Sequence, residues 1–237
     1  MLPKIIHYCW FGGNEKPDAA KKCIASWQKS CPDYEIREWN ESNVDLASCP
    51  QYVRDAYGAK KYAYVSDYIR LKALYEHGGF YMDTDVELLK PLDFLREDRA
   101  VIGFENDAFV NSGQLLAAEA GHPILLEMME RYDHVSFYKP DGSMFLLGCP
   151  HVNTEVLCNH GLVKDGSEQT VADVHVYSAD WFNPLDSATG LLNKTENTVS
   201  IHWYSMSWIS PARRLRVKIM RVVRRNLKRM GLLGGYE

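Results

Sequence analysis

Residues 66–85 read SDYIRLKALYEHGGFYMDTD. The stretch predicts a helix over residues 61–77, which the glycines at 78 and 79 end, because glycine is favoured just past the C-terminus of a helix. It predicts a strand over residues 80–86 directly after them. A helix that leads through a glycine turn into a strand is typical of an α/β domain.

The predicted strand carries the tripeptide Asp83-Thr84-Asp85. Side chains two residues apart in a strand point to the same face, so the two carboxylates should lie together. They repel each other unless a cation lies between them, and oxygen ligands of this kind suit Mg²⁺ or Mn²⁺. Such a metal can bridge the two phosphates of a nucleotide sugar. An Asp-x-Asp pair is also common as two solvated turn carboxylates, and that alternative stays open.

The predicted helix carries Asp67 and Arg70, which lie three residues apart and therefore face each other. Ala63 and Leu74 flank them on the same helical face, so we expect a partly desolvated ion pair. The pair is either part of a binding site or a structural ion pair.

The remaining pattern, over a chain of 237 residues, predicts one α/β domain with a shorter, irregular second half. Strands are expected over residues 3–10, 34–39, 100–104, 114–118, 175–177 and 199–203, and further helices over residues 18–30, 123–132 and 152–159. The first strand, helix and strand form a predicted βαβ unit. His7 lies in the apolar first strand, where we expect a core histidine rather than a ligand.

The string from Ser66 to Asp85 resembles the DXD sugar-binding region of family 32 glycosyltransferases and, more distantly, the glucosylating domains of large clostridial toxins. The opening IIHYCWFGG at residues 5–13 is similar to the first strand of that family. The stretch HWYSMSW at residues 202–208 resembles its closing motif. The resemblance therefore extends from about Pro3 to Trp208.

This resemblance implies a GT-A fold, a single Rossmann-like nucleotide-binding mixed sheet flanked by helices, with a metal site at the edge of the sheet. It implies that Asp85 ligates Mn²⁺ or Mg²⁺ directly, and that Asp83 contacts ribose or sugar and reaches the metal. His202 is a candidate further ligand, since imidazole suits Mn²⁺ better than Mg²⁺. The alternative for His202 is a hydrogen-bonded core histidine.

The resemblance also assigns the donor. Trp10 would line the nucleobase, although a plain core tryptophan is the alternative. Asp67 and Arg70 would hydrogen-bond the hydroxyls of the donor sugar, so that Arg70, Asp83 and Asp85 form the expected catalytic set. Ser207 and Trp208 would hold the β-phosphate, with the indole N–H as a donor.

The acceptor side is less defined. The stretch Asn111-Ser112-Gly113 is a candidate loop on that side, and Glu105 or Asp107 could approach the anomeric carbon. The resemblance implies retention of the α-anomeric configuration, which requires a covalent intermediate or attack from the same face. The sequence identifies no nucleophile.

The expected reaction moves a hexosyl group from a UDP-sugar or GDP-sugar to a hydroxyl of a glycan acceptor, which we expect to be lipid-linked in the synthesis of a surface polysaccharide such as capsule or O-antigen. The alternatives are a toxin-like enzyme that modifies a protein, a nucleotidyltransferase that makes the nucleotide sugar, and a non-catalytic, metal-dependent carbohydrate-binding module. The net charge of −4 argues against a protein that coats nucleic acid.

Location is predicted from three features. The six cysteines contain no Cys-x-x-Cys pair, which excludes zinc-ribbon and thioredoxin-type sites. The first ten residues do not resemble a signal peptide, and no apolar run is long enough to span a bilayer. We therefore expect a cytoplasmic protein with free thiols.

The last segment differs from the rest. Residues 211–230 hold nine basic residues and no acidic one, which leaves 18 basic against 31 acidic residues elsewhere. Apolar residues recur there at helical spacing, so residues 211–237 are expected to be a basic amphipathic tail behind a domain of residues 1–210. Such a helix is a candidate anchor on the inner face of the plasma membrane. Packing on an acidic surface of its own domain or of a partner is the alternative, and no nucleic-acid-binding motif accompanies it.

Overall fold

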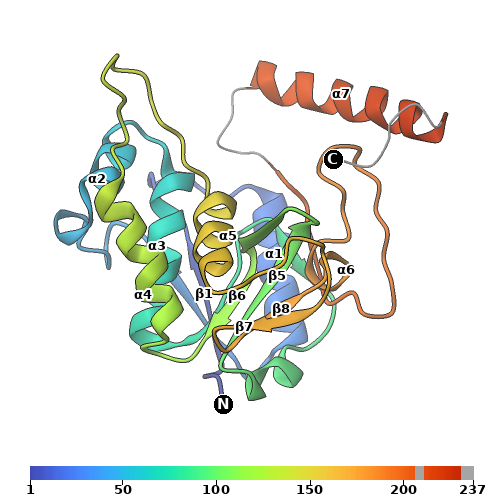
Figure 1. Cartoon of the computed structure of the whole chain (residues 1–237), viewed down its shortest axis with the longest axis horizontal. Coiled ribbons are helices and arrows are strands. Elements are labelled where there is room, and N and C mark those ends of the chain that lie inside the picture. The colour runs from blue at the N-terminus through green and yellow to red at the C-terminus, as the bar shows by residue number, and fades with distance from the viewer. Residues whose placement is uncertain (206–210, 231–237) are drawn as a thin grey trace.

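The computed structural model describes residues 1–205 and 211–230. In this part of the chain a seven-stranded mixed sheet lies between two layers of helices (Figure 1). Its strands are β1 (Ile5–Cys9), β2 (Glu35–Trp39), β3 (Gly79–Tyr81), β5 (Ala100–Asn106), β6 (Phe109–Ala118), β7 (Gln169–Val171) and β8 (Val174–Tyr177). A separate two-stranded sheet pairs β4 (Val86–Leu88) with β9 (Ser200–His202). The helices are α1 (Asp18–Ser30), α2 (Gln51–Gly58), α3 (Tyr62–His77), α4 (Pro123–Glu130), α5 (Cys149–Asn159), α6 (Ala179–Phe182) and α7 (Pro211–Arg229).

The strand order is β2-β1-β3-β6-β5-β8-β7. Strand β1 runs parallel to both β2 and β3, while β6 is antiparallel to β3 and β5. The carboxyl ends of β1 and β3 therefore meet at one edge of the sheet, which is where open α/β sheets bind their ligands.

Both faces of the sheet are buried, so successive strand residues enter different cores. Leu116 belongs to the core under α2, α3, α4 and α5, whereas its neighbour Leu115 belongs to the core on the opposite face. Helix α1 covers that second face through Trp27, which is fully buried and donates its indole N–H to the carbonyl of Val86. This bond ties α1 to β4 of the small sheet.

The α/β class and the first βαβ unit are confirmed, as are the helices expected over residues 18–30 and 61–77. The strand expected over residues 80–86 is wrong, because the chain turns between β3 and β4. The N–H of Asp83 donates to the carbonyl of Gly113, and the N–H of Val86 donates to the carbonyl of Asp83. The loop expected over residues 111–113 is also wrong, since these residues lie within β6. Helix α2 and strand β7 were not predicted.

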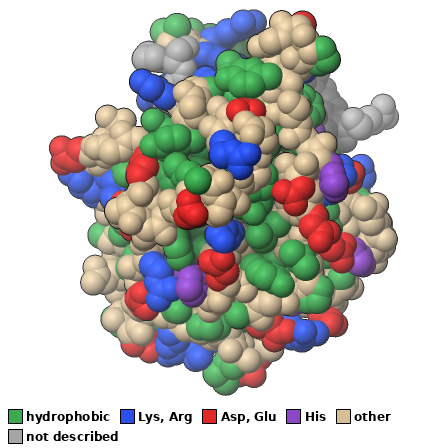
Figure 2. Space-filling view, turned by 90° about the vertical axis from the view of Figure 1, so that its left-hand side faces the viewer, with side chains coloured by type: hydrophobic (Ala, Val, Ile, Leu, Met, Phe, Trp, Pro, Cys, Tyr) green, Lys and Arg blue, Asp and Glu red, His purple; other side chains and the backbone are tan. Residues whose placement is uncertain are grey.

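All six cysteines are free, as expected, and five of them are buried. In residues 1–205 and 211–230, no helix combines the length and hydropathy that crossing a membrane requires. Acidic and basic side chains are interspersed on the face of the body that carries α2 and α4 (Figure 2).

Candidate functional site

Hydrogen bonds place the two aspartates at the junction between the sheets. Strand β3 ends at Tyr81, and the N–H of Met82 still donates to the carbonyl of His7 in β1. The turn that follows sends β4 away from the main sheet to pair with β9, where Val86 lies opposite His202. Two separate pieces of sequence therefore meet at the edge that the ends of β1 and β3 form.

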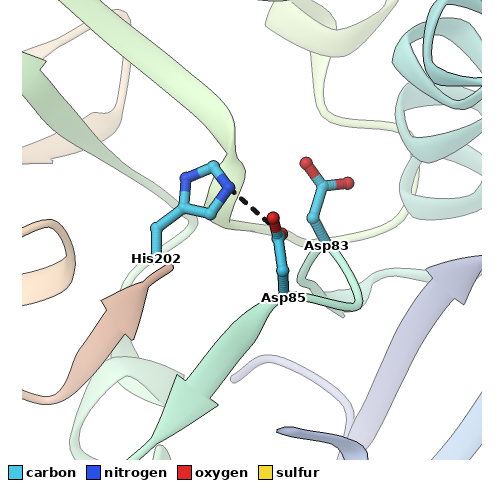
Figure 3. Close-up of side chains that lie close together, drawn as sticks. All are labelled: Asp83, Asp85 and His202. Atoms are coloured by element: carbon cyan, nitrogen blue, oxygen red, sulfur yellow. Dashed lines mark ion pairs between the residues drawn. The ribbon is translucent and has the colours of Figure 1, made fainter. Parts of the chain in front are cut away.

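A cluster of three side chains results, from Asp83, Asp85 and His202 (Figure 3). Nε2 of His202 lies 3.2 Å from Oδ1 of Asp85. One potential ligand atom from each residue falls within 4.8 Å of the others. The second oxygen of Asp85 accepts the backbone N–H of Ser205 at 2.7 Å, which fixes the carboxylate toward the cluster.

The donor atoms of this cluster suit a divalent cation, and its two carboxylates differ in pKa. Burial raises the pKa of Asp83, an effect that nearby Asp85 strengthens and Arg70 opposes. Burial also acts on Asp85, but His202 and the N–H of Ser205 hold the pKa of that carboxyl well below its usual range. Two carboxylate oxygens with one imidazole nitrogen form a donor set that Mn²⁺ accepts readily. The residues present therefore fit a metal held by Asp83, Asp85 and His202.

Arg70 links the helix α3 to this edge. Its Nη2 lies 3.0 Å from Oδ1 of Asp67 and 3.0 Å from Oδ1 of Asp83. Its Nη1 donates to the hydroxyl of Ser112 at 3.1 Å and to Sγ of Cys149 at 3.0 Å. The guanidinium is almost fully buried, with 2% of Arg70 exposed. Its planar fork therefore positions the carboxylate of Asp83 from inside the protein.

Asp67 is the most deeply buried carboxylate of the site, with 6% of the residue exposed. Burial raises its pKa to about 6, and Asp83 adds to that effect while Arg70 opposes it. Its second oxygen accepts the N–H of Cys149 at 3.2 Å. The sequence-based expectation of a desolvated pair between Asp67 and Arg70 is confirmed.

Strand β6 closes the site from the opposite side. Its pairing with β5 is interrupted, because Ile102 lies opposite Leu116 whereas Gly103 lies opposite Asn111. Irregularities of this kind re-aim backbone and side chains next to binding sites. Here the interruption brings Gly113 so close to Asp83 that a Cβ at position 113 would lie 2.2 Å from its Oδ2.

The two acidic residues expected on the acceptor side, Glu105 and Asp107, lie in different surroundings. Glu105 accepts a hydrogen bond at 3.0 Å from Nδ2 of Asn111, whose Oδ1 accepts the N–H of Gly113 at 2.7 Å. Burial lowers the pKa of His202, but Asp85, Asp83 and Glu105 outweigh this effect and raise it. Asp107 instead lies beside Gly166, where a Cβ would meet its carboxylate. The structure therefore connects Glu105, but not Asp107, to the surroundings of the cluster.

The predicted nucleotide residues have different outcomes. Trp10 follows β1 directly, half-buried, at the same edge as the DXD turn, and donates its indole N–H to the carbonyl of Asn14 at 2.6 Å. It also packs against the core below α1. Ser207 and Trp208 lie outside the described residues, so their assignment to the β-phosphate stays a prediction.

Several residues that shape the site were not assigned a role from the sequence. Tyr81 donates its hydroxyl to Asp83 at 3.0 Å, and its ring lies 4.8 Å from the guanidinium of Arg70. Tyr204 stacks on the ring of His202 with centroids 4.2 Å apart. Tyr81 precedes Asp83 by two residues and Tyr204 follows His202 by two residues, so their places in the sequence could have drawn attention to both. Cys149 gave no such signal, because it reaches Arg70 across 79 positions of the chain.

Comparisons with known proteins agree with this geometry. Residues 17–102 match the family described as "Glycosyltransferase sugar-binding region containing DXD motif". Inositol phosphoceramide mannosyltransferase 3 of Schizosaccharomyces pombe is 30% identical over 143 residues, covering 57% of this chain and 38% of the relative. Inositol phosphoceramide mannosyltransferase 1 of the same yeast is 25% identical over 158 residues, covering 58% and 46%. The chain thus spans less than half the length of these curated relatives.

A solved structure, the PaToxG Glycosyltransferase, superposes with a TM-score of 0.52 over 67% of this chain and 69% of that one, at 20% identity. At this identity the likeness concerns the fold, and it confirms the expected GT-A architecture. The matched family region ends within β5 and includes Asp67, Arg70, Asp83 and Asp85. Residues 17–102 of this chain therefore match the sugar-binding region of the glycosyltransferases that contain the DXD motif.

Proposed function

We propose that the protein is a metal-dependent, retaining hexosyltransferase that moves a sugar from a nucleoside diphosphate to a hydroxyl group. The observation that carries this proposal is the convergence of Asp83, Asp85 and His202 beside the buried Arg70–Asp67 pair. A carbohydrate-binding module would need no such combination of a cation site and a buried ion pair at the nucleotide edge of an α/β sheet.

The surroundings of each site residue indicate its role in the proposed reaction. Asp85 stays anionic and, with Asp83 and His202, would hold Mn²⁺ or Mg²⁺, which supplies electrostatic stabilisation of the departing diphosphate. Arg70 holds Asp83 through its Nη2, while its Nη1 donates to the hydroxyl of Ser112. Asp67 and Arg70 would orient the hydroxyls of the donor sugar, and Trp10 would line the base. Pre-organised charges of this kind are usually the largest contribution to catalysis.

The acceptor is proposed to be a lipid-linked glycan in the synthesis of a surface polysaccharide. Two curated relatives are named inositol phosphoceramide mannosyltransferases, so an acceptor that carries a lipid and a donor that carries mannose are the first choices to test. The basic segment at residues 211–230 supports work at an anionic membrane surface.

Hydrolysis of the donor tests the reaction without knowledge of the acceptor. The protein would be incubated with a panel of UDP-sugars and GDP-sugars, GDP-mannose included, in the presence of Mn²⁺ or of EDTA. Slow release of nucleotide from one donor, with Mn²⁺ only, is the expected result, and it identifies the sugar at the same time.

Two further outcomes are informative. Metal-dependent binding of a nucleotide without hydrolysis would support a transferase that requires its acceptor before the donor is cleaved. Neither hydrolysis nor metal-dependent nucleotide binding would overturn the proposal and favour a binding module.

A further inference from the structure

Helix α7 contacts the rest of the protein through arginines. Nε of Arg221 donates to the carbonyl of Ser187 at 2.9 Å. Four residues later, Arg225 donates to the carbonyls of Thr189 and Gly190 at 3.2 Å and 3.1 Å. Residues four apart share one face of a helix, so α7 is held to the loop between α6 and β9 by a polar face.

Another face of α7 is apolar, and within the described part of the chain it is exposed. Residues 215, 219, 222, 223 and 230 follow helical spacing on the side away from Arg221 and Arg225. This apolar stripe consists of Leu215, Ile219, Val222, Val223 and Met230, which are 60%, 55%, 54%, 43% and 61% exposed. Figure 1 shows α7 at the outside of the molecule, apart from the central sheet. An amphipathic helix that docks by its polar face leaves its hydrophobic face for another surface.

Charge identifies that surface. Arg216, Lys218 and Arg224 are exposed on α7 as well, and residues 211–230 contain no acidic residue. A second copy of the helix would bring like charges together, whereas an anionic bilayer offers both an apolar interior and opposite charge. We propose that α7 binds the surface of an anionic membrane, with the apolar stripe inserted and the basic side chains among the lipid headgroups.

The position of α7 in the chain connects this surface to the site. Ser205, whose N–H binds Asp85, is six residues before Pro211. Six residues of extended chain span about 20 Å at most. Because Ser205 binds Asp85, the start of a membrane-bound α7 lies within about this distance of the turn that carries Asp83 and Asp85. That a lipid-linked acceptor would be reached in this way rests on the proposed function, whereas membrane binding itself does not.

Co-sedimentation with vesicles tests the proposal on the full chain, with no donor present. Vesicles of phosphatidylcholine mixed with phosphatidylglycerol should bind the protein, vesicles of phosphatidylcholine alone should bind it weakly, and added salt should weaken binding to the mixed vesicles. The double variant Ile219→Ser/Val222→Ser removes two apolar side chains without changing charge. It should raise the lipid concentration at half-binding by about tenfold or more.

Val217→Ser provides the matched control, because Val217 lies in α7 outside the apolar stripe and is only half exposed. It should change vesicle binding by less than about twofold, since it leaves the inserted face intact. Circular dichroism of each variant establishes that α7 and the body remain folded. Equal binding by the double variant and the control would overturn the proposal. So would absence of binding to the mixed vesicles, or self-association through the stripe without vesicle binding. None of these outcomes depends on donor hydrolysis.

Discussion

At the scale of single residues, Gly113 supports the site by lacking a side chain. A Cβ there would lie 2.2 Å from Oδ2 of Asp83 and 3.1 Å from Oδ1 of Asn111. We predict that Gly113→Ala displaces the carboxylate of Asp83 and lowers donor hydrolysis about 100-fold, as misplacement by about 1 Å can do. Steady-state release of nucleotide measures the effect.

The control for this prediction is Gly58→Ala. A Cβ at Gly58 meets no atom within 4 Å, and the residue ends α2. Hydrolysis by this variant should stay close to that of the unmodified protein. If Gly113→Ala were equally active, the close approach of β6 to Asp83 would have no role in the site.

Arg70 gives a second prediction at this scale. Lysine keeps the charge but cannot serve Asp67, Asp83, Ser112 and Cys149 at once, because its ammonium lacks the planar fork. Partners that remain buried without a hydrogen bond cost about 1–3 kcal/mol each. Arg70→Lys should therefore lower the free energy of unfolding by about 2–3 kcal/mol, as urea denaturation would show.

Arg37→Lys is the matched control, because Arg37 pairs with Glu35 through two hydrogen bonds at the surface. Exposed ion pairs contribute about 0–1 kcal/mol, so its urea midpoint should hardly move. Equal stability losses in the two variants would contradict the view that Arg70 is a buried structural centre of the site.

At the scale of elements, His7 joins β1, β2 and the end of α3. The indole N–H of Trp39 donates to Nδ1 at 3.0 Å, so the proton of the neutral ring is on Nε2, which donates to the carbonyl of Gly78 at 2.9 Å. A protonated ring would place a second N–H against Trp39. Burial lowers the pKa of His7 to about 4, and this confirms the expected core histidine.

The stability of the protein should therefore fall in acid. In the unfolded chain the pKa of His7 is close to its ordinary value of about 6.5, so between that pH and about 4 only the unfolded state takes up the proton. Stability contributed by neutral His7 is present above this window and is lost as the pH falls through it. His7→Gln removes the titration. From pH 7 to pH 5 the unfolding free energy should fall by about 2 kcal/mol more in the unmodified protein than in this variant. Parallel pH dependences would contradict this explanation.

The elements also show what sequence patterns can predict. The helix α3 and the glycines after it were predictable because periodicity and capping are local signals. The separation of β3 from β4 was not, since it depends on Gly113 accepting the N–H of Asp83 from a distant strand. The sequence therefore suggested one strand over residues 80–86, whereas a turn brings the two aspartates together.

At the scale of the whole molecule, the same distinction applies to the site. Asp67, Arg70, Asp83 and Asp85 share one short stretch and could be found by resemblance. His202 reaches them through the pairing of β4 with β9 and was suggested by resemblance. Ser205, which binds Asp85, and Cys149, which binds Asp67, could not be placed, because only tertiary contacts bring them to the site.

The thiols give a prediction for the whole molecule. Five of the six cysteines are buried and only Cys158 is partly exposed. Burial raises the pKa of Cys9 to about 12, which further lowers its reactivity. A thiol-specific chromogenic reagent should therefore label about one thiol in the native protein and all six after denaturation. Rapid labelling of several thiols without denaturant would contradict the described packing.

The central claim is that Asp83, Asp85 and His202 hold a cation that receives the diphosphate of the donor. Calorimetric binding of UDP and GDP, with Mn²⁺ or with EDTA, to the unmodified protein and to Asp85→Asn tests it most directly. We predict tight binding of one nucleotide with Mn²⁺ only, and its loss in Asp85→Asn although the variant stays folded. Equal binding in EDTA, or unchanged binding by Asp85→Asn, would contradict the claim.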